Sequence, residues 1–316
     1  MPRFKIQHIT KYTYEAPVRD SANKVILFPI KDEYQEVLKH DLKITGEPPL
    51  DIYKDYYGNE VGSFTTSSVH NELVIDSVTE VVTKPKALPD DSKTKEEQWS
   101  LLLQARQQVN FIDFLRIEAY DALPELITVA ELVDNRELTP LAAAQRLNDY
   151  VFNNFQYIKG VTNVETTLQE IWELKAGVCQ DFAHMLAAML RTIKIPARYV
   201  SGYVCPNKNG MRGEGATHAW VEAYIPFYGW LGIDPTNNVL VNDLHVRLAV
   251  GRNYSDCSPV KGAYKGTSNQ KLEVGVTVSY EDGHVNKDLS TILTPQPTRT
   301  ETQNSYRRFL EMQQQQ

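Results

Sequence analysis

Apolar and polar residues alternate in short runs along the first part of the chain, which is typical of β-strands with one buried face. The runs include FKIQHITKYTY, EVLKHDLKITG and ELVIDSVTEVVT, and turn-forming segments such as GEPP and YGNE separate them. We therefore predict an antiparallel, sandwich-like β domain over residues 1–88. The segment KPKALPDDSK, with two prolines and a cluster of charges, marks its end.

Helical spacing replaces this alternation farther along the chain. In TPLAAAQRLNDYVFNNF, Thr139 can cap a helix whose first residue is Pro140. The most regular apolar stripe lies in VCQDFAHMLAAMLRTIKI, which predicts a helix packed on a core. The strand patterns ARYVSGYV, THAWVEAYI, GWLGID and LEVGVTVSY follow it, so residues 89–280 are predicted to form an α+β domain. Residues 281–316 are polar, interrupted by proline and end in four glutamines, which predicts a mobile tail.

Composition narrows the classes of partner. The 316 residues are 42% hydrophobic and 23% charged, as in ordinary soluble domains, and the net charge of -7 does not favour a nucleic-acid partner. The first residues lack a secretory pattern, and no apolar run has the length that a membrane helix needs. Three cysteines without CxxC spacing fit a reducing compartment, so we expect a cytoplasmic protein with no membrane partner.

Cys179 stands in the first turn of the predicted core helix. Backbone N–H groups there lack intrahelical partners, and the helix dipole adds positive potential. Both favour the thiolate and can stabilise an oxyanion beside the sulfur. Alternatively, a free cysteine is simply a small hydrophobic side chain buried in the core. The presence of a base near Cys179 would favour the nucleophile over this alternative.

A predicted hairpin supplies such a base. Strict alternation in THAWVEAYI places His218 and Trp220 on one face, and WLGIDPT presents Asp234 on a common face with Trp230. If Tyr224 pairs with Trp230, His218 becomes a diagonal neighbour of Asp234, although a slip of one residue would separate them. The carboxylate could then accept one imidazole N–H and leave the other nitrogen to face the thiol. Taken singly, the histidine could be an ordinary strand residue and the aspartate a turn initiator.

The segments GVCQDFAHMLAAMLRTIKIPARYVSGY, GEGATHAWVEAYIPFYGWLGIDPTN and HVRLAVGRNYSD resemble the bacterial transglutaminase-like superfamily, often described as cysteine proteases. The N-terminal β segment is similar to the N-terminal region of that family. The resemblance implies a papain-like α+β core with Cys179 as nucleophile, His218 as general base and Asp234 as the orienting carboxylate. Thr217 stands where many members are expected to have serine.

The function predicted from these residues is acyl transfer on amide bonds of a peptide or protein substrate, with hydrolysis favoured. The alternatives are a protein-glutamine transglutaminase or deamidase, and a non-catalytic peptide-binding module. No cofactor is expected. A zinc site is not expected either, because no ligand spacing supports it, and no calcium-binding loop signature occurs.

Three further residues are candidates for the oxyanion site or the cleft lining, with packing as their ordinary explanation: Gln180, Tyr157 and Trp220. His184 falls on the polar side of the helix and is predicted to lie on the surface. Cys205 and Cys257 are expected to be structural or incidental.

Overall fold

The computed structural model describes residues 1–134, 137–205, 211–212, 217–266, 269–280 and 294–295. It divides into two units. The first combines Met1–Thr83 with the described part of Ser258–Gln316, and the second is Lys84–Cys257.

The first unit is a curled antiparallel sheet organised around one long strand, β1 (Arg3–Val25). The first half of β1 lies between β5 (His70–Thr83) and β14 (Gln270–Tyr280), and its second half pairs with β4 (Glu60–Thr66) and β13 (Val260–Lys265). The pairing register shifts where β1 passes from one set of partners to the other, which is how a bulge bends a strand. The remaining strands are β2 (Gln35–Ile44), on the free edge of β5, and β3 (Asp51–Lys54), on β4.

One face of this sheet is buried, as the alternation predicts. In β5 every second residue from Leu73 to Thr83 is buried, and Phe4 and Ile6 of β1 are buried opposite it. The predicted antiparallel β domain is therefore confirmed.

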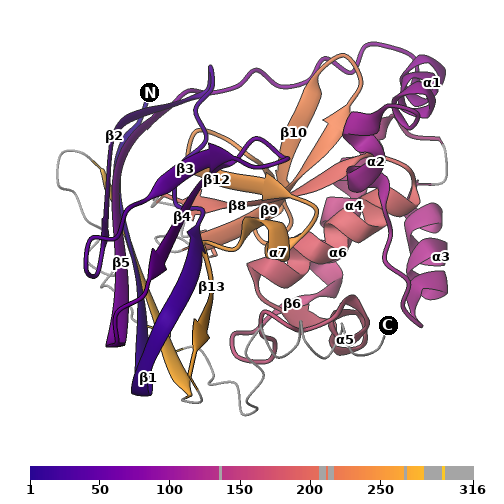
Figure 1. Ribbon diagram of the computed structural model, residues 1–316. Coiled ribbons are helices and arrows are strands. Elements are labelled where there is room, and N and C mark those ends of the chain that lie inside the picture. Colours follow the sequence, from indigo (N-terminus) through magenta and orange to yellow (C-terminus); the bar gives the residue numbers. More distant parts are fainter. Residues whose placement is uncertain (135–136, 206–210, 213–216, 267–268, 281–293, 296–316) are drawn as a thin grey trace. The chain divides into compact units, whose positions relative to one another are not determined.

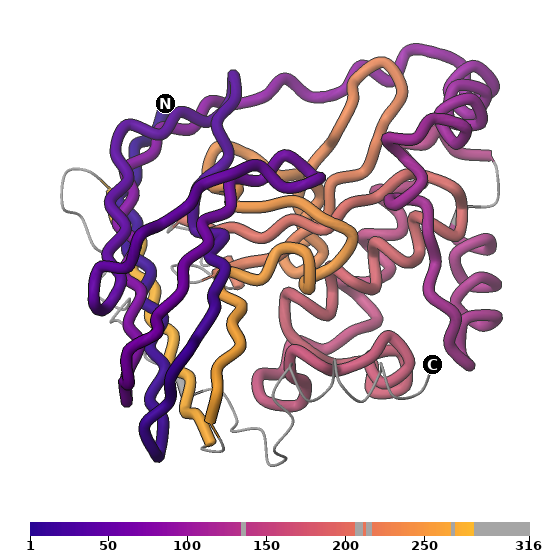
Figure 2. Tube along the Cα trace, viewed as in Figure 1, coloured from indigo at the N-terminus to yellow at the C-terminus, as the bar shows by residue number. Residues whose placement is uncertain are grey.

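The end of the β domain differs from the prediction. The strand pattern LEVGVTVSY was assigned to the α+β domain of residues 89–280, but it forms β14 and pairs with β1 from Phe4↔Tyr280 to Tyr14↔Gln270. In Figure 2 the orange-yellow strands β13 and β14 lie beside the indigo strand β1, with which both pair. Alternation identifies a strand without identifying its partner, so the sequence pattern could not assign this strand to the first unit. The predicted tail lies outside the described residues except for β15 (Thr294–Pro295), which pairs with β14.

The second unit is an α+β domain, as predicted. Its antiparallel sheet has the strand order β11-β10-β9-β8-β12. The strands are β8 (Ala197–Val204), β9 (Thr217–Ile225), β10 (Gly229–Asp234), β11 (Val239–Leu240) and β12 (His245–Gly251). The helices are α1 (Lys95–Ala105), α2 (Val109–Leu115), α3 (Leu123–Asp134), α4 (Pro140–Asn154), α5 (Leu168–Leu174), α6 (Cys179–Thr192) and α7 (Tyr254–Cys257). Two short strands, β6 (Gln156–Tyr157) and β7 (Ala176–Gly177), pair in parallel.

Helix α6 packs against β9 and β8, with α3, α4 and α5 also in contact with it (Figure 1). Its apolar stripe is buried at Phe182, Met185, Leu186 and Met189, which confirms the predicted core helix. Thr139 caps α4 by accepting the N–H of Ala142 at 3.2 Å. In the described ranges, no helix combines the length and apolar character needed to span a lipid bilayer.

Candidate active site

The first turn of α6 presents Cys179 with unused backbone donors. The N–H groups of Asp181 and Phe182 donate to the carbonyl of Val178 at 3.0 and 3.1 Å. Within the described part of the chain, the N–H groups of Cys179 and Gln180 have no acceptor. The Cys179 side chain is half-buried. The thiol therefore lies at a positively polarised helix end beside donors that a developing oxyanion could use.

A buried carboxylate fixes the start of this helix. Asp181 is 1% exposed, and its Oδ2 accepts the N–H of Val178 at 2.7 Å and the hydroxyl of Thr162 at 2.6 Å. A Cβ on Gly177 would lie 2.7 Å from the Asp181 Cβ. Gly177 therefore makes room for the carboxylate that caps α6. Burial raises the pKa of Asp181, and its hydrogen bonds to Thr162 and Val178 oppose this rise.

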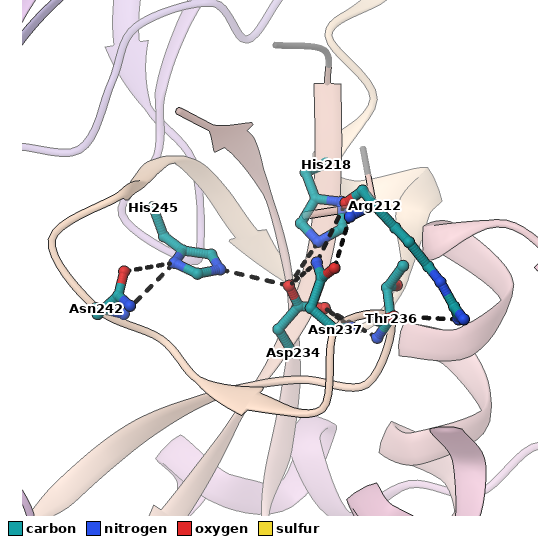
Figure 3. A network of polar contacts seen from close by, with 7 residues as sticks. All are labelled: Arg212, His218, Asp234, Thr236, Asn237, Asn242 and His245. Carbon is teal, nitrogen blue, oxygen red and sulfur yellow. Dashed lines mark hydrogen bonds and ion pairs between the residues drawn. The ribbon is translucent and has the colours of Figure 1, made fainter. Parts of the chain in front are cut away.

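The hairpin of β9 and β10 has the predicted register, with Tyr224 opposite Trp230. His218 Nε2 is 2.8 Å from Asp234 Oδ2, and both side chains are fully buried (Figure 3). The diagonal pairing inferred from alternation is thus present as a direct hydrogen bond.

Asp234 also anchors the turn that follows it. Its Oδ1 accepts the N–H groups of Thr236 at 2.9 Å and Asn237 at 3.3 Å, and its Oδ2 accepts Asn237 Nδ2 at 2.7 Å. Burial alone would raise the pKa of Asp234, but the neighbouring His218 and the hydrogen bonds from His218 and His245 hold it well below its usual range. The aspartate therefore remains a carboxylate while it also initiates the DPTN turn.

His218 connects this carboxylate to the thiol. Burial disfavours its imidazolium form, but the charge and hydrogen bond of Asp234, followed by those of Cys179, raise the pKa of His218 to about 10. Nε2 is occupied by Asp234, whereas Nδ1 is buried and makes no hydrogen bond of standard geometry to the described residues. Nδ1 is thus the nitrogen available to Cys179, and the structure brings the three predicted residues together.

The other candidates occupy different positions. Tyr157 is half-buried, and burial raises its pKa, with a further contribution from the nearby Cys179. Gln180 is half-buried in the first turn of α6. Trp220 is fully buried, so it packs behind the site instead of lining an open cleft, with its ring centroid 6.2 Å from that of His218.

His184 corrects one expectation, because it is half-buried and not on the surface. Its Nε2 accepts the N–H of Tyr254 at 3.0 Å, and its ring packs 5.0 Å from that of Tyr199. Burial, with Arg191 nearby, lowers the pKa of His184 to about 4. The start of α7 covers a side of α6 that the helical pattern alone marks as polar.

The sequence reasoning missed His245, which is 4% exposed and lies with Nε2 3.4 Å from Asp234 Oδ2. It also missed Arg212, whose backbone N–H donates to Asn237 Oδ1 at 2.7 Å and whose guanidinium lies 5.8 Å from the Tyr157 ring. His245 belongs to the segment HVRLAVG, but no alternation or spacing links that segment to Asp234.

The two remaining cysteines, Cys205 and Cys257, are buried and not in a disulfide. Across the described residues, no group of three or more histidine, cysteine, aspartate or glutamate side chains could hold a metal ion.

Comparison with known proteins identifies similar sequences over both units. The sequence model of the Transglutaminase-like superfamily matches residues 127–235, and that of the Bacterial transglutaminase-like N-terminal region matches residues 4–82. An uncharacterized protein of Mycobacterium leprae is 31% identical over 284 residues, which are 88% of this chain and 99% of that protein. A shorter segment, 22% of this chain and 11% of the relative, is 36% identical to a protein-glutamine gamma-glutamyltransferase of Pseudomonas aeruginosa.

A solved structure extends the similarity to the fold of nearly the whole chain. The crystal structure of a proposed cysteine protease from Cytophaga hutchinsonii covers 96% of this chain and 96% of its own, with a TM-score of 0.69 and 21% identity. At this identity the similarity establishes the shared fold.

Proposed function

The chain belongs to the transglutaminase-like superfamily, and from that premise we propose that it is a cysteine-dependent enzyme that hydrolyses amide bonds of a peptide or protein substrate. The observation that carries the proposal is the buried hydrogen bond between His218 Nε2 and Asp234 Oδ2, with His218 Nδ1 left for the Cys179 thiol. A histidine oriented by a carboxylate and adjacent to a thiol is an activated nucleophile pair.

In the proposed reaction the Cys179 thiolate attacks the amide carbonyl carbon, and the carbonyl electron pair moves onto oxygen. The N–H groups of Cys179 and Gln180 stabilise this oxyanion at the start of α6. His218 gives its proton to the leaving amine as the C–N bond breaks, and a thioester remains. Water, deprotonated by His218, then attacks the thioester, which releases the carboxylic acid and the thiolate.

Transamidation is the second candidate, because part of the chain is similar to a protein-glutamine gamma-glutamyltransferase. The first half of the reaction is unchanged, and the acyl group comes from a glutamine side chain. A primary amine replaces water as the attacking group, so the product is a substituted amide.

Mass spectrometry of a peptide mixture incubated with the protein tests both candidates. Peptide-bond hydrolysis produces two shorter peptides, deamidation converts a glutamine into a glutamate, and transamidation attaches an added primary amine. We expect shorter or deamidated peptides with or without the amine. Amine-linked products alone would favour the second candidate.

A pair of variants identifies the nucleophile in the same assay. Cys179→Ala should lower product formation by roughly 10⁴-fold or more. Cys205→Ala removes a thiol that is fully buried in β-sheet surroundings and should leave product formation within about twofold. Equal activity of Cys179→Ala and the unmodified protein would disprove the proposal.

A further inference from the structure

We propose that His245 is a positioning residue that holds the Asp234 carboxylate in the orientation used by His218. The Asp234 Oδ2 atom lies between two imidazoles that come from different strands, His218 of β9 and His245 of β12 (Figure 3). The catalytic consequence of this inference rests on the proposed function, whereas the contact itself does not. His245 also lies beyond the residues 127–235 that match the superfamily model.

The chemistry of the contact defines the direction of the hydrogen bond. A charged carboxylate only accepts hydrogen bonds, so a nitrogen that faces it in a buried place must carry a proton. The two side chains are fully buried, with His245 Nε2 3.4 Å from Asp234 Oδ2. A bare Nε2 would place two lone pairs against each other without solvent between them. Nε2–H of His245 is therefore the donor.

The other ring nitrogen supports the same tautomer. His245 Nδ1 lies 3.4 Å from the backbone nitrogen of Asn242, which can only donate, and 3.3 Å from Asn242 Oδ1, which can only accept. The Asn242 Oδ1 atom already accepts the N–H of Leu244 at 2.9 Å. A neutral ring carries one proton, and the buried carboxylate of Asp234 requires it on Nε2, so Nδ1 is bare and accepts from the backbone N–H of Asn242. Burial lowers the pKa of His245, and Asp234 opposes this only in part, so the ring donates without adding a positive charge.

Packing holds the ring of His245 in place. Trp220 approaches it in an edge-on arrangement, with ring centroids 5.3 Å apart and an interplanar angle of 79°. Trp220 in turn lies against Gly202 of β8, where a Cβ would be 2.9 Å from the Trp220 Cζ3 atom. Gly202 thus lets the indole approach the sheet, and the indole supports the imidazole.

These contacts restrain Asp234 from both sides. Without the second donor, the remaining anchors of Asp234 besides His218 all come from Thr236 and Asn237 of the turn that follows it, and none comes from β12. The carboxylate would then be held less firmly in the plane that His218 uses. Loss of the His245 donor would therefore affect the orientation of His218 and the reactivity of Cys179 more than it affects substrate affinity.

The tautomer can be measured in the unmodified protein. Long-range ¹H–¹⁵N spectra of the histidine rings at neutral pH should show His245 protonated at Nε2 and bare at Nδ1. A proton on Nδ1 would remove the donor that faces Asp234 and would overturn the inference. This measurement needs no variant and no substrate.

Two variants separate the donor from the packing. His245→Phe keeps an aromatic ring against Trp220 and removes the donor, whereas His245→Gln can donate to Asp234 without the ring. We expect the low-field Nε2–H resonance of His218 to shift or disappear in His245→Phe and to persist in His245→Gln. The rate of Cys179 alkylation by iodoacetamide should fall about tenfold in His245→Phe and by less than about threefold in His245→Gln.

The outcomes distinguish this inference from the proposed function. Unchanged alkylation and an unchanged His218 resonance in His245→Phe would overturn the positioning role. Equal losses in both variants would overturn it too, because the donor that His245→Gln retains would then not protect the site. If Cys179→Ala kept its activity, the proposed function would fail, while the His218 resonance would still report whether His245 positions Asp234. With turnover measured, His245→Phe should lower kcat and leave KM within about twofold.

Discussion

At the residue scale, Asp234 is the most heavily constrained side chain of the site. It accepts hydrogen bonds from His218, His245 and Asn237 and from the backbone of the turn that follows it. A buried carboxylate is tolerable only when its oxygens are satisfied in this way. Its negative charge is also the main reason that the pKa of His218 is raised although burial would lower it.

Asp234→Asn should therefore lower kcat by roughly 10²–10⁴-fold with little change in the folded structure. The amide presents a donor where His218 needs an acceptor, and the pKa of His218 falls because the negative charge is gone. Turnover and the pH profile of Cys179 alkylation measure the two effects. Asp256→Asn, which removes the charge that pairs with Arg252, is the matched control and should keep the turnover and the alkylation profile of the unmodified protein. Parallel losses in the two variants would contradict the prediction.

His184 makes a prediction about acid stability. Its pKa is lowered from 6.5 to about 4 by burial, so the unfolded chain binds a proton there that the folded chain does not. Stability is thus fully present above pH 6.5 and is lost as the pH falls towards 4. His184→Gln should reduce the loss of unfolding free energy between pH 8 and pH 5 by about 1–2 kcal/mol.

Chemical denaturation at the two pH values measures this difference. The comparison at pH 8 serves as the control, because His184 is neutral there in both states. An equally steep pH dependence in the variant would show that His184 is not the group that titrates.

Residues of the site differ in how well the sequence predicts them. The His218–Asp234 pair follows from the two-residue period of strands, since the register places both on one face. His245 reaches the same carboxylate from the start of β12, a strand on the opposite side of β8 and β9, and alternation does not specify strand order. His184 was misplaced because a helical pattern describes one helix and not the segments that cover it.

At the scale of elements, the start of α6 depends on the short β7 segment before it. Gly177 of β7 provides the space that the Asp181 side chain fills, and Asp181 holds the N–H of Val178 next to Cys179. Gly177 thus affects the position of Cys179 indirectly, by making room for the Asp181 side chain that caps α6. The sequence alone, in which a glycine stands shortly before a cysteine, does not show this link.

Gly177→Ala should displace this cap. We expect a decrease in unfolding free energy of about 1–3 kcal/mol and slower alkylation of Cys179, because the added methyl group meets the Asp181 side chain. Thr162→Val, which removes one hydrogen bond to Asp181 without crowding, should have the smaller effect on both. Denaturation curves and alkylation rates measure the two effects. A larger effect of Thr162→Val than of Gly177→Ala would contradict the prediction.

At the scale of the whole molecule, the first unit is closed by strands that are distant in sequence. β14 pairs with the first half of β1 over its entire length, and its Val278, opposite Ile6, is fully buried. The stability of residues 1–83 therefore depends on residues near position 280.

Val278→Asp should reduce the unfolding free energy of the first unit by about 3 kcal/mol or more, because it places an unpaired charge in the core of the sheet. Hydrogen exchange of the β1 amides should accelerate. Lys271→Gln, at an exposed position of the same strand, is the control and should leave exchange unchanged. Protection of β1 that survives Val278→Asp would contradict the dependence on β14.

The fold class was predictable because the periodicity of apolar residues within each segment identifies it as a strand or a helix. The strands of the first unit and the helices α4 and α6 are examples. The assignment of β14 was not, because its residues identify it as a strand but it pairs with β1 across more than two hundred positions. The other distant partner of β1, β13, was not among the predicted strands. Strand pairing is decided by tertiary packing, which a window of sequence does not contain.

This topology also has a consequence for biosynthesis. The β1 strand leaves the ribosome before its partner β14, which is translated only after the whole second unit. At typical elongation rates the wait is on the order of ten to fifty seconds, during which one edge of β1 has no native strand beside it. Nascent chains of this protein should therefore expose this sheet edge between the synthesis of β1 and that of β14, and ribosome-associated chaperones that shield such edges would be most needed before β14 emerges.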